Sequence, residues 1–242
     1  DIAITLGMGW LAFMVISDAI ISPSGTGNIY MNATPRVIYG WAKAGTFFKA
    51  FTHIDKASGI PRPALWLTFG VSIFWTLPFP SWEQLISVVS AALVLSYAIA
   101  PVTAAGLRRN APDLPRPFRV RAFGIIGPVS FMISALIVYW SGWNTLSWLL
   151  GLQIVMFVVY VMCKGKVPEH TVSLAQQVKS SLWLIVFYAL IIIFSWLGSF
   201  GGLNVIGHPW DTVLVAAMSL GIYYWGARSC LPQANFSGDE EE

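Results

Sequence analysis

Residues 85–109, LISVVSAALVLSYAIAPVTAAGLRR, combine a long apolar run with two consecutive arginines at its end. About 20 apolar residues are enough for a helix to cross the hydrocarbon core of a bilayer. Basic residues beside such a run bias the adjoining loop to the cytoplasmic side. The stretch therefore predicts a spanning helix, expected over residues 83–107, with a cytoplasmic C-terminal end.

The same pattern recurs along the chain and predicts seven spans. Their expected ranges are 8–33, 63–80, 83–107, 122–139, 146–163, 182–200 and 212–227. All fourteen Lys and Arg residues fall in four places: residues 36–62, 108–121, 164–179 and position 228. If these are the cytoplasmic connections, the N-terminus lies outside and the C-terminus inside. We expect a multi-pass protein of the plasma (inner) membrane.

Composition agrees with an all-α integral membrane protein in contact with a lipid bilayer. Only 10% of the residues are charged and 56% are hydrophobic, whereas about 25% are charged in soluble domains. The basic residues are loop anchors and form no continuous face, which argues against nucleic acid as a partner. Tryptophans mark both expected interfaces: Trp82, Trp140, Trp143, Trp148 and Trp210 outside, and Trp41 and Trp225 inside.

The expected domain is 1–231, a transmembrane domain that forms the C-terminal part of a longer protein. Three connecting segments have expectations of their own. Residues 47–51 predict a short interfacial helix, because three phenylalanines lie beside lysines. Residues 164–180 are polar and predict a cytoplasmic loop, and the acidic tail 232–242 is expected to be disordered.

Polar residues inside the first span are candidates for a substrate or ion site. They are Asp18, Ser22, Ser24, Thr26 and Asn28. Thr26 is ten residues, about 15 Å, from Arg36, which places it near the middle of the membrane. Pro23 is expected to free a backbone carbonyl and break the helix there, as at transporter sites. Hydroxyl and carbonyl oxygens would suit a small cation or an ammonium group.

Each candidate has a simpler alternative that the sequence leaves open. Small and hydroxyl residues such as Ser22, Ser24 and Thr26 also pack helices together. Asp18, about 12 Å further out, can line a wet outer vestibule without binding anything. On the third span, Ser96 and Tyr97 fall near the middle of the membrane. Tyr97 is either a gate of a central cavity or an ordinary packing residue.

Signals of enzyme chemistry are weak, so we expect no enzyme and no cofactor. The three histidines are in loops and are not spaced with acids or cysteines as a metal site requires. The sequence has no Walker loop, dinucleotide-binding turn or nucleophile elbow. Transport is the first hypothesis, and a membrane structural or assembly subunit without transport activity is the alternative.

Two stretches resemble the amino acid–polyamine–organocation permeases. TPRVIYGWAKAG (34–45), FFKAF (47–51) and GIPRPALWL (59–67) are similar to the eighth helix and its following loop. Residues 85–120 are similar to the tenth helix and its proline-rich exit. The resemblance departs in one detail, since Ala44 stands where an acidic residue usually precedes the loop glycine.

The resemblance implies a five-plus-five inverted-repeat fold and secondary active transport of amino acids or related amines by alternating access. It implies coupling to H⁺, to Na⁺ or to exchange. Ser22 to Asn28 would border the ion and substrate region, with Ser96 and Tyr97 on the tenth helix. Helices one to seven have no counterpart in this chain, so the N-terminal half of the carrier is an expected partner.

Overall fold

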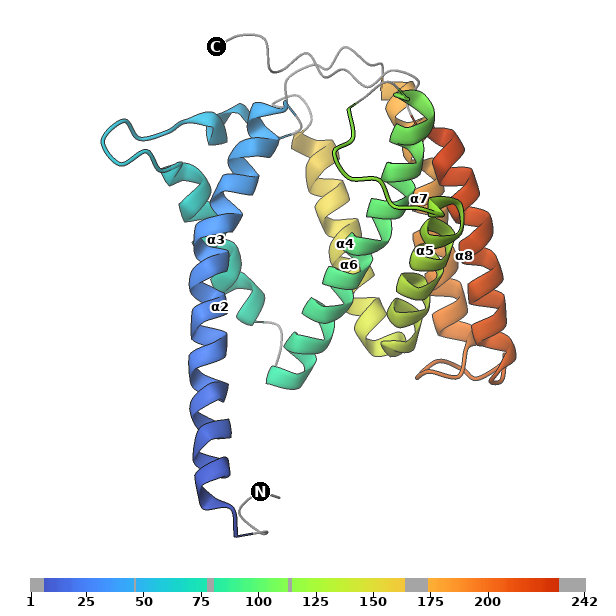
Figure 1. The fold of residues 1–242 in the computed structure, drawn as a ribbon, viewed down its shortest axis with the longest axis horizontal. Helices are drawn as coiled ribbons and strands as arrows, with labels where there is room; N and C mark the ends of the chain where they lie inside the picture. Colours follow the sequence, from blue (N-terminus) through green and yellow to red (C-terminus); the bar gives the residue numbers. More distant parts are fainter. Residues whose placement is uncertain (1–6, 46, 78–80, 113–114, 164–173, 231–242) are drawn as a thin grey trace. The chain divides into compact units, whose positions relative to one another are not determined.

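The computed structural model describes residues 7–45, 47–77, 81–112, 115–163 and 174–230. In this part the secondary structure is entirely helical (Figure 1). The α-helices are α2 (Gly9–Lys43), α3 (Arg62–Thr76), α4 (Trp82–Asn110), α5 (Phe123–Trp140), α6 (Gly142–Cys163), α7 (Leu174–Leu197) and α8 (Trp210–Ser229). A 3₁₀ helix, η1 (Lys49–Thr52), lies between α2 and α3.

The seven α-helices correspond one to one with the seven predicted spans, and the all-α fold is confirmed. The agreement is best for α4 and α5, whose ends fall within three residues of the predicted spans. Within the described residues, three helical segments are long and apolar enough to cross a bilayer: Trp82–Asn110, Phe123–Trp140 and Val178–Leu197.

Three local expectations were wrong. The first helix does not break at Pro23 or end near Arg36: α2 continues for 35 residues with two prolines inside it. Hydropathy marks where a helix leaves the lipid, whereas α2 continues to Lys43, two residues before Gly45, whose φ of 72° suits a glycine that follows a helix. Helix α7 begins at Leu174, inside the expected loop, because polar residues extend a helix into water. In the region predicted to form a short interfacial helix, the structure has the four-residue η1, and its place at a membrane interface stays a prediction.

Contacts divide the chain into two compact units. Unit 1 contains α2, η1 and α3, and unit 2 contains α4 to α8. We describe each unit by itself. The expected single domain 1–231 stays a prediction, and the tail 232–242 lies outside the described residues.

Unit 1 packs around the C-terminal part of α2. Ile38 and Ala42 are buried on α2, and Ala64 and Thr68 are buried on α3. The Phe47 ring lies 5.0 Å from Phe48 and 5.3 Å from Phe51, measured between ring centroids. In the following loop Asp55 forms an ion pair with Arg62 at 3.0 Å.

The hydrogen bond from the Ser58 hydroxyl to Asp55 (2.6 Å) holds the pKa of this carboxyl below its usual value. The loop thereby keeps a negative charge beside Arg62 at the start of α3.

Unit 2 has an aromatic core centred on Phe131 of α5, which is 1% exposed. Its ring centroid lies 5.1 Å from Phe187 of α7 and 6.0 Å from Tyr223 of α8. Helix α8 approaches its neighbours closely at Gly226, where an added Cβ would lie 2.8 Å from Val102 and from Trp183. A small residue at such a crossing lets the helix backbones come together.

The two ends of unit 2 are held by different contacts. At one end, Asn110 donates a hydrogen bond to the Cys230 carbonyl, and the Arg108 guanidinium lies 4.0 Å from the centre of the Phe123 ring. Arg116 folds back and donates to the Leu107 carbonyl at the end of α4. Leu107 and Phe123 are in predicted spans, next to the connection 108–121 that was predicted to be cytoplasmic, and this orientation stays a prediction.

A buried carboxylate joins three segments at the opposite end of unit 2. Asp211, fully buried in the first turn of α8, accepts hydrogen bonds from the Tyr139 hydroxyl of α5 (2.7 Å) and from the Ser199 hydroxyl. The Thr212 backbone N–H also donates to it, at 2.6 Å. Nearby, the Trp143 N–H donates to the Phe200 carbonyl at 2.9 Å. The network joins α5, the α7–α8 connection and α8 at this end.

We predict that Tyr139→Phe destabilises unit 2. The change keeps the ring but removes a hydrogen bond to a buried carboxylate, which costs about 1–3 kcal/mol. The midpoint of thermal unfolding of the purified protein in detergent should fall by several degrees. Tyr224→Phe is the matched control, because Tyr224 is 51% exposed. Equal midpoints for the two variants would contradict a stabilising role of the network.

Candidate functional site

The five polar candidates of the first span fall on two sides of α2. Asp18, Ser22 and Thr26 are spaced by four residues and form one row along the helix. Ser24 and Asn28 form a second row, and about 200° separate Ser22 from Ser24 around the helix axis. The two rows therefore cannot face the same neighbouring helix.

Two of the three hydroxyl groups in these rows bond to the backbone of their own helix. Ser24 donates to the Ile20 carbonyl at 2.7 Å, and Thr26 donates to the Ser22 carbonyl at 2.9 Å. These bonds occupy the hydroxyl hydrogens and leave oxygen lone pairs to accept. Each row therefore presents hydrogen-bond acceptors, which suit a cation or an ammonium group.

The polar rows do not pack against other parts of unit 1. Residues 21–30 are all exposed, and an added Cβ at Gly25 or Gly27 would meet no atom within 4 Å. The buried side chains of α2 begin further along, at Pro35. The helix-packing alternative for Ser22, Ser24 and Thr26 is thus not realised within this unit.

The candidates on α4 also lie away from the core of their unit. Tyr97 is 64% exposed, and Ser96 is exposed with its hydroxyl bonded to the Leu93 carbonyl at 2.7 Å. The buried face of α4 runs through Leu95 and Ala98 instead. Packing within unit 2 therefore does not explain Tyr97. The α2 and α4 candidates belong to different units, and their role as one site stays a prediction.

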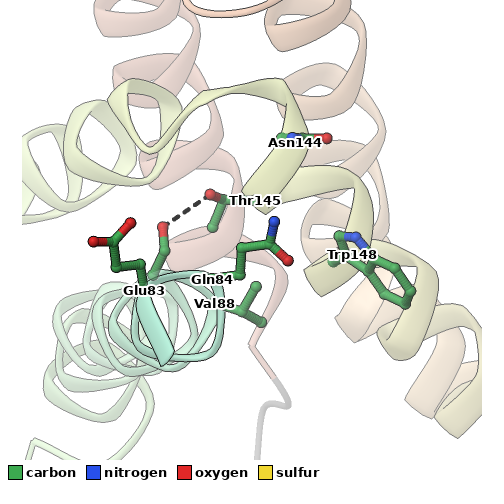
Figure 2. A pocket seen from close by; sticks show the side chains of 7 residues that line it. Glu83, Gln84, Val88, Asn144, Thr145 and Trp148 are labelled. Carbon is green, nitrogen blue, oxygen red and sulfur yellow. Dashed lines mark hydrogen bonds between the residues drawn. The ribbon is translucent and has the colours of Figure 1, made fainter. Parts of the chain in front are cut away.

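Unit 2 contains a polar pocket that the sequence analysis did not identify (Figure 2). It lies between the first turns of α4 and α6 and has a volume of about 220 Å³. Its lining residues are Glu83, Gln84, Ser87, Val88, Asn144, Thr145 and Trp148. Five of these are polar residues in two separate helices, and only the tertiary structure brings them together. The signal available in the sequence was an acid and an amide at the start of α4, and an amide and a hydroxyl at the start of α6.

A second cavity lies between α6 and α7 and measures about 540 Å³. Its wall is largely aliphatic, with Ile154, Leu184 and Ile192 among the lining residues. Such a wall offers little to a polar solute. We therefore take the polar rows and the pocket of Figure 2 as the candidate sites.

Comparison with known proteins identifies the family. A family model described as "Amino acid permease" matches residues 3–159, well over half of the chain. The chain belongs to this amino acid permease family. The resemblance found in the sequence is thereby confirmed, and the family is one of membrane transport proteins, not enzymes.

Two curated relatives are from Bacillus subtilis (strain 168). The chain is 56% identical over 241 residues to an aspartate-proton symporter, a match that covers 99% of the chain and 46% of the relative. It is 34% identical over 231 residues to the glutamate/serine transporter AimA, which covers 95% of the chain and 42% of the relative. The chain thus spans about half the length of these relatives. No solved structure matches.

We predict that the hydroxyls of the α2 rows act in transport. In the complete carrier, Thr26→Val keeps the side-chain shape but removes the acceptor oxygen. Loss of one such contact to a charged group costs about 1.5–3 kcal/mol, or about tenfold or more in apparent affinity. Uptake kinetics and their ion dependence should change while the amount of protein in the membrane stays normal.

Thr103→Val is the matched control, because Thr103 is an exposed threonine of α4 that bonds to the Ile99 carbonyl in the same way (3.1 Å). Its uptake should equal that of the wild type. Unchanged uptake kinetics for all three variants, Ser22→Ala, Ser24→Ala and Thr26→Val, would show that these residues have a structural role only.

Proposed function

We propose that this chain is the C-terminal part of a proton-coupled carrier of acidic amino acids that works by alternating access. The 56% identity to an aspartate-proton symporter, over 99% of the chain, carries the proposal. The second relative is named for glutamate and serine, which supports an acidic substrate. H⁺ is then the coupling ion, in preference to Na⁺.

The exposed polar rows of α2 fit this role. Side chains with free acceptor oxygens are costly to expose to hydrocarbon, so in a membrane they require a polar partner or water. In the proposed carrier the partner is the N-terminal half, and the rows border the path of substrate and proton. Asp18 shapes the outer vestibule, and Tyr97 on α4 contributes to gating.

The proposed location is the plasma membrane, with the basic connections in the cytoplasm. In unit 2 this orientation places Asp211 and the pocket of Figure 2 at the outer end. Arg108, Arg116 and Cys230 are then at the inner end.

We predict that the complete carrier takes up aspartate together with protons. In proteoliposomes, an inward proton gradient should drive saturable uptake of radiolabelled aspartate, with excess glutamate competing. A proton ionophore should abolish accumulation against the gradient, while replacement of external Na⁺ by choline should leave it unchanged. Uptake that requires Na⁺ and ignores the proton gradient would overturn the proposed coupling.

Residues 1–242 alone provide the control. They should show no saturable aspartate uptake, and co-expression with the N-terminal half should restore it. Saturable uptake by these residues alone would show that the chain needs no such partner.

A further inference from the structure

The pocket between α4 and α6 is built by two helix starts. Ser81 precedes α4 and accepts a hydrogen bond from the Gln84 backbone N–H at 3.3 Å, which fixes the first turn of that helix. Gly142 begins α6 with a φ of 83°, a conformation that favours glycine. Figure 2 shows side chains from both helices around the space between them.

A hydrogen bond joins the two walls. The hydroxyls of Ser87 on α4 and Thr145 on α6 lie 2.9 Å apart, and Thr145 is buried. One hydroxyl donates to the other, so the pair keeps one hydrogen and several lone pairs for a further partner. The pocket therefore has a fixed polar base.

The other polar groups of the pocket are available. Within the described residues, the side chains of Glu83, Gln84 and Asn144 make no hydrogen bond or ion pair with another side chain. The Glu83 carboxylate supplies a full negative charge, and each amide supplies one acceptor oxygen. Each amide also has an NH₂ group that donates, but the carboxylate only accepts, so the pocket has more lone pairs that accept than hydrogens that donate.

Among the residues that the structure describes, no Lys, Arg or His of unit 2 forms an ion pair with Glu83. The Lys and Arg residues described in unit 2 are at positions 108, 109, 116, 119, 121, 179 and 228. Arg108 and Arg109 lie in the last turn of α4, whose first turn contains Glu83, and Arg228 lies in the last turn of α8. At the same end as Glu83, Asp211 is already bonded to Tyr139 and Ser199, and His208 lies 3.6 Å from Asp211. Glu83 is the carboxylate at this end whose charge is left for a cation.

The pocket also has an apolar side, formed by Val88 and the Trp148 ring. A bare metal ion would gain nothing from these groups, whereas the carbon atoms of an organic cation would contact them. An aromatic ring also attracts an ammonium group placed over its face. A volume of about 220 Å³ admits a small solute and not a drug-sized one.

We propose that this pocket binds a small organic ammonium compound, with the ammonium group held by Glu83. The ammonium group belongs either to a free primary amine or to an amino acid. The proposal goes beyond the transport activity proposed above and does not depend on it.

The test measures protection of a cysteine placed in the pocket. In the complete carrier with Cys163 and Cys230 changed to serine, Asn144→Cys supplies the reporter, and a neutral maleimide modifies it. Ethylamine should slow the modification in a saturable manner. Ethanol and acetate, which have similar size but no positive charge, should not. Aspartate as a further ligand distinguishes an amino acid from a free amine.

Two controls isolate the pocket and the charge. A reporter at the exposed His208 should gain no protection from ethylamine. Added to the Asn144→Cys reporter, Glu83→Gln should weaken protection at least about tenfold, because it removes the charge-assisted hydrogen bond. Asp55→Asn, which removes a carboxylate from unit 1, should leave protection unchanged.

Equal protection by ethanol or acetate, equal protection by NaCl alone, or protection that survives Glu83→Gln would each overturn the proposal. Equilibrium dialysis of radiolabelled ethylamine against the wild-type carrier and Glu83→Gln tests the site without the cysteine reporter. No difference between these two proteins would also overturn it. Aspartate uptake measured on the same wild-type preparation tests the proposed function separately.

Discussion

The structure depends on one constraint: backbone N–H and C=O groups find no hydrogen-bond partner in hydrocarbon. Every spanning segment must therefore satisfy its own backbone, and the helices tolerate residues that would end a helix in water. Helix α2 runs straight through Pro23, and the hydroxyls of Ser24 and Thr26 bond to carbonyls one turn back. At the end of α4, Arg116 donates to the Leu107 and Ala111 carbonyls, and the Leu107 carbonyl also accepts from the Ala111 backbone N–H. Near Pro23 and at the end of α4, polar side chains thus donate hydrogen bonds to backbone carbonyls.

The same constraint sets how much of the fold could be predicted. Hydropathy and the two arginines after residue 107 located both ends of α4 to within three residues, because the helix begins and ends close to the ends of its apolar run. They do not coincide in α2 and α7, whose helices extend beyond the apolar run. Hydropathy alone therefore misplaced the end of α2 and the start of α7. Glycine at position 45 was the better signal for the end of α2.

The candidate sites were predictable only in part. The sequence located the polar residues of α2, because an acid and hydroxyls stand out in an apolar run. It did not reveal that they form two rows whose hydroxyls bond to their own helix. Ser87 and Thr145, which bond in the Glu83 pocket, are 58 positions apart, and Tyr139 and Asp211 are 72 positions apart. No local pattern in the sequence indicates such pairings.

Both units present polar groups that can accept a further partner. The rows of α2 present acceptor oxygens, and Glu83 presents a negative charge that pairs with no Lys or Arg among the described residues. Asp211 at that same end is fully bonded and serves the structure. The contrast between the two carboxylates separates a structural role from an available binding group.

The account places the end of unit 2 that contains Glu83 and Asp211 on the outer side of the membrane. Cysteine labelling in intact cells measures this orientation directly. In a cysteine-free carrier, single cysteines at Glu83, Trp143 and His208 should react with a membrane-impermeant thiol reagent. A cysteine at Arg116 should react only after the membrane is permeabilised. Labelling of the Arg116 position in intact cells, with protection of the other three, would contradict the account.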